Sequence, residues 1–208
     1  MAPATPTDKD NSQHYFSPQP QVPSEPVDFE VTLRGLTFSL VSDRGVFSHG
    51  EVDKGSRLLA ETMQLPVRGQ ILDLGCGWGV LGLVAAKLVP EAHITLIDVN
   101  QRAASWAEEN LRRNKATNAE IICGDAPVAL GEREFEAIVC NPPVRAGKHQ
   151  VLRLVEDAAR RLGKGGALWL VVRTDKGAKS LGHDISVWFT QVETVAKRGG
   201  YRVLRCTK

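Results

Sequence analysis

The sequence predicts one α/β domain built on a doubly wound, seven-stranded, mostly parallel sheet that ends in a C-terminal antiparallel hairpin. Between residues 70 and 173, short apolar runs alternate with helical stretches of about 10–14 residues, a pattern typical of βαβ units. The chain has 208 residues, of which 42% are hydrophobic and 24% charged. That length suffices for one domain with a real core but not for two well-buried ones.

The N-terminal segment 1–26 holds six of the eleven prolines together with Ser, Gln and Thr, and it shows almost no apolar periodicity. Such a composition buries too little surface to offset the entropy of ordering the chain. We therefore expect 1–26 to be a flexible arm and 27–208 to form the folded domain.

An extension of the domain precedes the sheet. Phe29–Arg34 and Thr37–Val41 alternate in hydrophobicity around Gly35, which indicates a β-hairpin. Asp53 is a typical N-cap residue, and an amphipathic helix is expected from there to about Met63.

The alternating region predicts five parallel strands, which are Ile71–Leu74, His93–Asp98, Glu120–Cys123, Phe135–Cys140 and Ala167–Arg173. The expected helices between them are Val80–Leu88, Gln101–Asn114 and His149–Leu162. The chain then ends differently, with a helix near Gly177–Trp188 and two strands joined by a Gly-Gly turn, Gln191–Arg198 and Tyr201–Thr207. Because the last two strands form a hairpin, the final strand enters the sheet antiparallel.

Composition argues against a membrane-spanning, a secreted and a disulfide-stabilised protein. No run approaches the ~18 apolar residues of a membrane span, and the N-terminus lacks the basic and apolar regions of a secretory signal. The four cysteines are far apart without a C-x-x-C pair, so neither a disulfide framework nor a metal site is expected. These features predict a reduced, cytoplasmic protein that binds no membrane.

Charge is unevenly distributed along the chain. Residues 145–208 contain 14 Lys and Arg against 5 Asp and Glu, whereas residues 1–144 contain 12 against 19. A basic C-terminal third favours a polyanionic partner such as RNA. A solvated basic face that serves solubility explains the same charges equally well.

The strongest motif is the run Ile71-Leu-Asp73-Leu-Gly75-Cys-Gly77-Trp-Gly79, in which a strand enters a glycine-rich turn and then a helix. Glycines there let a ligand approach the backbone, and the helix N-terminus adds N–H donors. A dinucleotide site would need G-x-G-x-x-G, whereas this run is D-x-G-x-G-x-G. The acid ahead of its first glycine, Asp73, would repel a pyrophosphate and suits a ligand with an ammonium or sulfonium group. The alternative is a tight strand–helix connection without a ligand.

Two further strands end in acids. Asp98, followed by Val99, is placed to accept the hydroxyls of a ribose, and Asn100 already serves as the next N-cap. Asp125 could accept from an adenine amine, with the Ala126 N–H donating to the ring. Taken alone, the second motif is also compatible with a solvated turn.

Asn141-Pro142-Pro143 follows the fourth strand, at the region where α/β sheets bind ligands. The Asn141 side-chain carbonyl and the Pro142 backbone carbonyl can accept two hydrogens from one amino group, and the prolines hold these acceptors rigid. This directs the nitrogen lone pair toward an electrophile. The alternative is an Asn-Pro-Pro turn that ends a strand.

Together these motifs resemble class I S-adenosylmethionine (SAM)-dependent methyltransferases, with a Rossmann-like fold. More narrowly the chain resembles the methyltransferase small-domain family that includes ribosomal RNA small subunit methyltransferase C. The single-domain bacterial members share the segments His14-Tyr-Phe-Ser, Gly45-Val-Phe-Ser48, Asp53-Lys-Gly-Ser56 and the loop at 141–148.

The resemblance implies methyl transfer from SAM to an exocyclic amine, guanine N2 of 16S ribosomal RNA, with rRNA or the small ribosomal subunit as partner. It implies that Asp73, Gly75 and Gly77 contact the methionine end of SAM and that Gly79 belongs to the same cofactor-binding turn. Asp98 would contact the ribose, and Asp125 and Ala126 the adenine. Val99, next to Asp98, is also expected to border the cofactor. Asn141 would border the cofactor and, with Pro142 and Pro143, orient the amine. Gly55 and Ser56 would close over the methionine carboxylate.

One position departs from the pattern of many amine methyltransferases, which carry Tyr or Phe where this chain has Val144. The departure disfavours DNA-adenine and protein-glutamine substrates. Another residue must then stack on the target base, with Phe47, Tyr15 or Phe16 as candidates, although Phe47 could equally belong to the core. Arg145 and Lys148 follow Val144 and could hold phosphates, or form a solvated loop.

Two other functions remain open on the sequence. The same fold and cofactor could serve a small-molecule or protein amine, because nothing in the motif separates these substrates from RNA. The chain could also be a non-catalytic RNA-binding or SAM-sensing domain, although the intact Asn-Pro-Pro motif argues against it.

Overall fold

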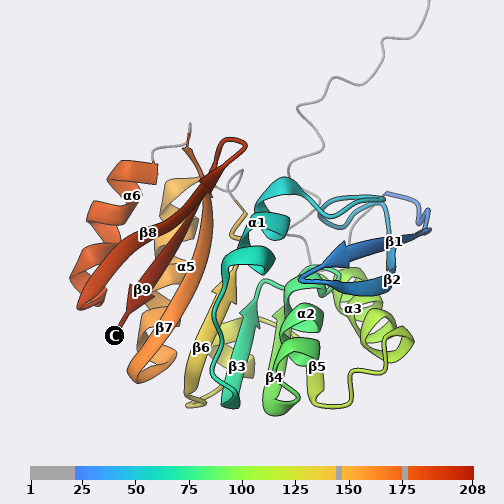
Figure 1. The fold of residues 1–208 in the computed structure, drawn as a ribbon, viewed down its shortest axis with the longest axis horizontal. Helices are drawn as coiled ribbons and strands as arrows, with labels where there is room; N and C mark the ends of the chain where they lie inside the picture. The colour runs from blue at the N-terminus through green and yellow to red at the C-terminus, as the bar shows by residue number, and fades with distance from the viewer. Residues whose placement is uncertain (1–21, 144–146, 175–177) are drawn as a thin grey trace, which may run out of the picture.

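A computed structural model describes residues 22–143, 147–174 and 178–208, and it confirms the predicted fold class (Figure 1). The sheet has seven strands in the order β5-β4-β3-β6-β7-β9-β8. Their bounds are β3 Arg68–Leu74, β4 Glu91–Asp98, β5 Ala119–Cys123, β6 Phe135–Cys140, β7 Leu162–Arg173, β8 Gln191–Arg198 and β9 Tyr201–Thr207. The first five strands pair in parallel, and β9 lies antiparallel between β7 and β8, as the Gly-Gly hairpin predicts.

Helices cover both faces of the sheet. One hydrophobic cluster packs α1 (Lys54–Thr62), α2 (Val80–Leu88) and α3 (Gln101–Arg113) on one face. A second cluster packs α4 (Ala126–Ala129), α5 (Lys148–Arg161) and α6 (Ala178–Ile185), followed by the 3₁₀ turn Ser186–Trp188, on the other. Within β3, Ile71 belongs to the first cluster and Leu72 to the second. Both faces of the central strands are buried, which explains why apolar residues predominate in their middle parts.

The N-terminal hairpin forms a separate two-stranded sheet of β1 (Val27–Leu33) and β2 (Leu36–Ser42). Arg34 and Gly35 in its turn have φ angles of 53° and 74°, the positive values of a tight hairpin turn. The buried Asn110 of α3 joins this sheet to the domain. Its Oδ1 accepts from Val41 N at 2.8 Å, and its Nδ2 donates to the carbonyls of Val41 and Trp78 at 2.9 Å.

Some element boundaries differ from the sequence prediction. β7 begins at Leu162 rather than Ala167, because Leu162 already pairs with Phe135 before the register shifts. The glycines at 163–166 therefore lie within an irregular strand start rather than in a loop. The four-residue α4 was not expected, since one helical turn leaves no hydrophobic periodicity to recognise.

Residues 22–26, the end of the predicted arm, are bonded to the domain. Ser24 Oγ donates to Asp43 Oδ2 at 2.7 Å, and Arg102 Nη1 donates to the Val22 carbonyl at 2.9 Å. The rest of the arm, with Tyr15 and Phe16, lies outside the described residues, so its flexibility stays a prediction. Among the helices of the described ranges, none has the length and apolar character to cross a membrane.

Candidate functional site

The predicted site residues come together at one edge of the sheet. β5, β4, β3 and β6 are neighbours and run parallel, so their carboxyl ends meet at the same edge. That edge carries the glycine turn after β3, Asp98 at the end of β4, Asp125 after β5 and Asn141 after β6. It is the edge at which α/β sheets bind ligands.

The glycine turn is held close to β4. The backbone N–H groups of Gly75 and Cys76 both donate to the Ile97 carbonyl at 3.0 Å. Gly75 and Gly77 have positive φ angles of 72° and 56°, and a Cβ atom at either would meet no atom within 4 Å. The turn therefore needs glycine for its conformation, and open space lies beside it in which a ligand can approach the backbone.

Gly79 has a different environment. It is the N-cap of α2, and a Cβ atom there would lie 2.9 Å from Ala107 Cβ and 3.1 Å from a methyl group of Leu96. Close packing of α2 against α3 and β4 is enough to require glycine at this position. A direct role of Gly79 in cofactor binding stays a prediction.

Asp98 joins the glycine turn to the next helix. Its Oδ2 accepts from Gly77 N and its Oδ1 from Asn100 N, each at 2.8 Å. Burial raises the pKa of Asp98 above its usual range, against the lowering effect of these hydrogen bonds. The carboxylate is half-buried at the strand end, and Val99 beside it is half-buried as well. Asn100 caps α3, as predicted.

Asp73 lies beneath the glycine turn and is only 1% exposed. Its Oδ2 accepts from Gly82 N at 2.7 Å, whereas its Oδ1 has no hydrogen-bond partner. Burial, together with the nearby charge of Asp98, raises the pKa of Asp73 to about 7 despite the bond from Gly82. A buried carboxylate with an unused oxygen is costly unless a cation or donor compensates it.

The end of β5 adds the residues predicted to face an adenine. Gly124 N donates to the Asp98 carbonyl at 2.9 Å, which fixes this turn beside β4. Asp125 is exposed and makes no side-chain cap to α4, while Ala126 is buried at the first position of that helix. The two residues therefore border the same edge, with the carboxylate directed to solvent.

Asn141 meets the start of α1, 85 to 88 residues earlier in the chain. Its Nδ2 donates to Ser56 Oγ at 2.9 Å and lies 3.4 and 3.5 Å from the two carboxylate oxygens of Asp53. An ionised carboxylate only accepts hydrogen bonds, so the amide must turn its NH₂ group toward Asp53 and Ser56. Its carbonyl oxygen consequently faces the other way and is left to accept from a ligand.

The segment from Asp43 to Asp53 crosses the same edge and presents Phe47. Trp78 Nε1 donates to the Phe47 carbonyl at 2.6 Å, and Asn100 Nδ2 donates to the Gly45 carbonyl at 3.0 Å. The Phe47 side chain is 50% exposed, which contradicts its alternative assignment to the core. An exposed aromatic ring is thus tied through its own backbone to the glycine turn.

Of the two residues predicted to bind phosphates, Arg145 and Lys148, the structure describes only Lys148. Lys148 lies at the start of α5, where its Nζ is 2.6 Å from Asp184 Oδ2. This ion pair already engages the lysine, so a role toward phosphate stays a prediction. Val144 and Arg145 lie outside the described residues. Pro142 is buried and Pro143 half-buried after β6.

Sequence reasoning missed the partners that position the site. Asp53 was expected to cap α1, and it does so by accepting from Gly55 N and Ser56 N. Its contact with Asn141 had no signal in the sequence, because the two residues are 88 positions apart. Asn110 links the glycine turn to the hairpin through its bonds to Trp78 and Val41, and its burial is visible only in the structure.

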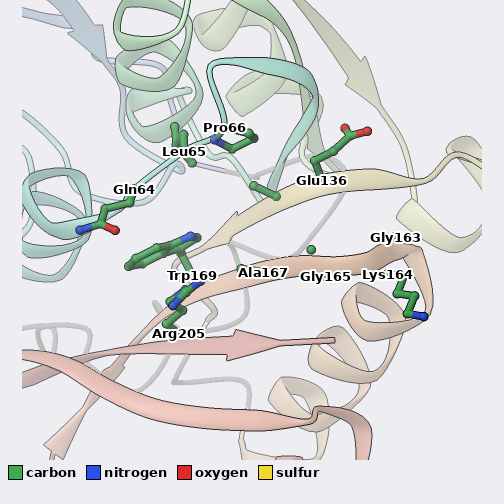
Figure 2. Close-up of a pocket in the computed structure, with 12 residues that line it drawn as sticks. Gln64, Leu65, Pro66, Glu136, Gly163, Lys164, Gly165, Ala167, Trp169 and Arg205 are labelled. Atoms are coloured by element: carbon green, nitrogen blue, oxygen red, sulfur yellow. The ribbon is translucent and has the colours of Figure 1, made fainter.

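A hollow lies at the opposite edge of the sheet and is lined by none of these residues (Figure 2). This cavity of about 430 Å³ is lined by the loop before β3 and by the starts of β6 and β7, with Trp169 and Arg205 at one side. Within the described ranges, no group of three or more His, Cys, Asp or Glu gathers for a metal ion.

Comparison with known proteins agrees with the geometry. Residues 37–205 match the family profile described as methyltransferase small domain. The uncharacterized protein YbxB of Bacillus subtilis is 39% identical over 95% of this chain and 99% of its own length. Ribosomal RNA small subunit methyltransferase C of Stutzerimonas stutzeri is 34% identical over 86% of this chain.

The chain spans about half the length of the methyltransferase C relatives that it matches, 54% for the Stutzerimonas protein. A similar solved structure is that of the T. thermophilus 16S rRNA N2 G1207 methyltransferase in complex with AdoMet and guanosine. The TM-score is 0.78 at 31% identity, covering 91% of this chain and 52% of that one. The fold is that of class I methyltransferases, and the chain belongs to the methyltransferase small-domain family.

Proposed function

We propose that this chain transfers the methyl group of SAM to guanine N2 of 16S ribosomal RNA. Membership of the methyltransferase family makes SAM the methyl donor. Both the Stutzerimonas and the T. thermophilus proteins are named as methyltransferases of ribosomal RNA, and the name of the second specifies N2 of a guanine; over the matched parts they are 34% and 31% identical to this chain. A ribosomal substrate also places the protein in the cytoplasm, beside the small subunit, and gives no role to DNA.

The residues present fit SAM. The space beside Gly75 and Gly77 admits a ligand to the backbone, and Asp98 offers a carboxylate to the ribose hydroxyls. Asp73 Oδ1 lacks a partner, and a cationic ligand above the turn would compensate this buried carboxylate. When bound, SAM supplies an electrophilic methyl group on a positively charged sulfur.

Asn141 and Pro142 would position the acceptor. The Asn141 carbonyl oxygen and the Pro142 backbone carbonyl would accept the two hydrogens of the guanine amino group. These contacts hold the nitrogen lone pair toward the methyl group, which is the orientation effect on which such a displacement depends. No strong base is needed, because the nitrogen becomes acidic as it is alkylated and then releases its proton to solvent.

One observation carries the proposal, namely the fixed amide of Asn141 beside the glycine turn. Without Asp53 and Ser56 the amide could present either end to a substrate, since its two ends are nearly equal in shape. With both acceptors in place, only the carbonyl end is available. A carbonyl acceptor suits an amino group on a base, which is a donor.

Phe47 completes the acceptor side of the proposal. A base drawn out of its RNA strand needs an aromatic surface to replace lost stacking. Phe47 is exposed at the edge that holds Asn141 and is anchored through its carbonyl to Trp78. It is therefore the described residue best suited to stack on the guanine.

The test is the identity of the methylated nucleoside. Naked 16S rRNA and assembled small subunits, both from cells lacking this protein, are incubated with the protein and labelled SAM, then digested to nucleosides. N2-methylguanosine in either sample is expected, with Asn141→Ala as the inactive control. A labelled adenosine or cytidine would refute guanine N2, and the absence of label despite SAM binding would refute the RNA substrate in favour of a protein or small-molecule amine.

A further inference from the structure

Two arginines flank a tyrosine at the carboxyl edge, next to the site. Arg173 ends β7, Arg198 ends β8, and Tyr201 begins β9 between them. The strand register pairs Tyr201 with Arg173 on one side and with Arg198 on the other. Residues in register on adjacent strands point to the same face, so the three side chains form one row. We call this row the edge platform.

The platform faces α1 and is accessible. Tyr201 packs at the margin of the cluster that contains α1, which assigns the row to the α1 face of the sheet. Both arginines are exposed, Tyr201 is half-buried, and the Arg173 guanidinium lies 5.9 Å from the centre of the tyrosine ring. Figure 1 shows the β8–β9 turn at the upper end of the sheet, where α1 also begins.

A chain of direct contacts joins the platform to Asn141. The Tyr201 ring covers Gly55, where an added Cβ atom would lie 2.9 Å from Tyr201 Cε1. Gly55 N donates to Asp53 Oδ1 at 2.8 Å, and Asp53 in turn contacts the Asn141 amide. The platform therefore borders the place where the acceptor amine is oriented, on the side away from the glycine turn.

We propose that the edge platform binds the RNA strand that flanks the methylated guanosine, with the arginines on phosphates and the Tyr201 ring against a neighbouring base. This inference rests on the proposed function and specifies the surface over which the RNA strand runs. Arginines spaced by one strand on either side of an aromatic ring match the alternation of phosphate and base along a single strand. The location also gives a role to part of the basic C-terminal third, which carries 14 basic against 5 acidic residues from 145 to 208.

The test measures binding of transcribed 16S rRNA as a function of salt, with SAM affinity as a folding control. Each phosphate contact contributes about 0.7 to the slope of log affinity against log salt on single strands. Arg173→Gln with Arg198→Gln should therefore reduce the slope by about 1.4. Tyr201→Leu should weaken binding about tenfold, whereas Tyr201→Phe, which keeps the ring, should bind like wild type.

A matched control removes two charges at the other edge of the sheet. Arg68 begins β3 and Lys164 lies in the first part of β7, and both are exposed at the amino edge. Arg68→Gln with Lys164→Gln changes the net charge by the same amount as the platform variant. It should leave the salt dependence of RNA binding unchanged if binding depends on the position of the arginines in the platform rather than on the total charge of the protein.

Several outcomes would overturn the platform. These are a platform variant with wild-type affinity and slope, an equal loss in the amino-edge control, or binding to intact small subunits with none to naked rRNA. Failure of the proposed function has a different signature. Wild-type protein that binds rRNA through the platform but adds no methyl group would refute the proposed reaction and leave the platform supported.

Discussion

The hydroxyl of Ser56 offers a direct way to disturb the orientation of the Asn141 amide. Ser56 is 4% exposed, and its Oγ is the nearest acceptor of the Asn141 amide, at 2.9 Å. Ser56→Ala deletes this bond and leaves only the longer contacts to Asp53, at 3.4 and 3.5 Å. The Asn141 amide then loses much of the preference for its working orientation.

The expected effect follows from the strength of one hydrogen bond. A neutral hydrogen bond contributes about 0.5–1.5 kcal/mol net, which corresponds to a roughly two- to twelvefold fall in kcat. Stability should change little, because Ala is a better helix former than Ser by up to about 0.5 kcal/mol and this partly offsets the lost bond. Steady-state methylation of rRNA, SAM binding and thermal unfolding are measured on the same preparation.

Thr62→Ala is the matched control, since it removes a hydroxyl from the far end of the same helix, where Thr62 bonds only the Leu58 carbonyl. It should retain wild-type kcat. The reasoning would be refuted if Ser56→Ala kept wild-type kcat. It would also be refuted if SAM affinity fell as much as kcat, because the serine would then act on the cofactor rather than on the Asn141 amide.

Three other predictions concern the cofactor side. Asp98→Asn should weaken SAM binding, measured by calorimetry, by roughly ten- to a hundredfold, because hydrogen bonds to a charged group contribute about 1.5–3 kcal/mol. Unchanged affinity would exclude Asp98 from the ribose site. Gly82→Ala should destabilise the fold by about 1–3 kcal/mol in urea unfolding, because its Cβ would lie 2.4 Å from Leu96 Cγ; a neutral result would show that α2 shifts freely. Burial raises the pKa of Asp73 from 3.8 to about 7, so between these values the folded state holds a proton that the unfolded state has released. The stability of ligand-free wild type relative to Asp73→Asn should therefore fall as pH rises from about 4 to 7, and a constant difference would contradict the assigned pKa.

The fold could be predicted from the sequence because the apolar residues of each central strand and helix follow the period of that element. α2 and β6 begin and end where their apolar patterns do, at Val80–Leu88 and Phe135–Cys140. The prediction was wrong for the start of β7, where glycines that usually mark a loop continue the pairing with Phe135. Local composition gives no information on such pairing, which depends on the neighbouring strand.

The candidate site also has one part that could be predicted from the sequence and one part that could not. Asp73, Gly75, Asp98 and Asn141 could be grouped from sequence because parallel topology brings strand ends to one edge. The contact of Asn141 with Asp53 could not, since it depends on how the N-terminal extension folds over that edge. Functional residues at the ends of the strands can therefore be predicted from the sequence, whereas the residues that orient their side chains cannot.

The most direct test of the account separates binding of the donor from orientation of the acceptor. Asn141→Ala protein is saturated with SAM, and a single turnover on rRNA is followed beside a measurement of the SAM dissociation constant. We predict that SAM affinity stays within about twofold of wild type while the transfer rate falls by about a hundredfold or more. Transfer at the wild-type rate would contradict the role of Asn141, and with it the mechanism built on this edge of the sheet.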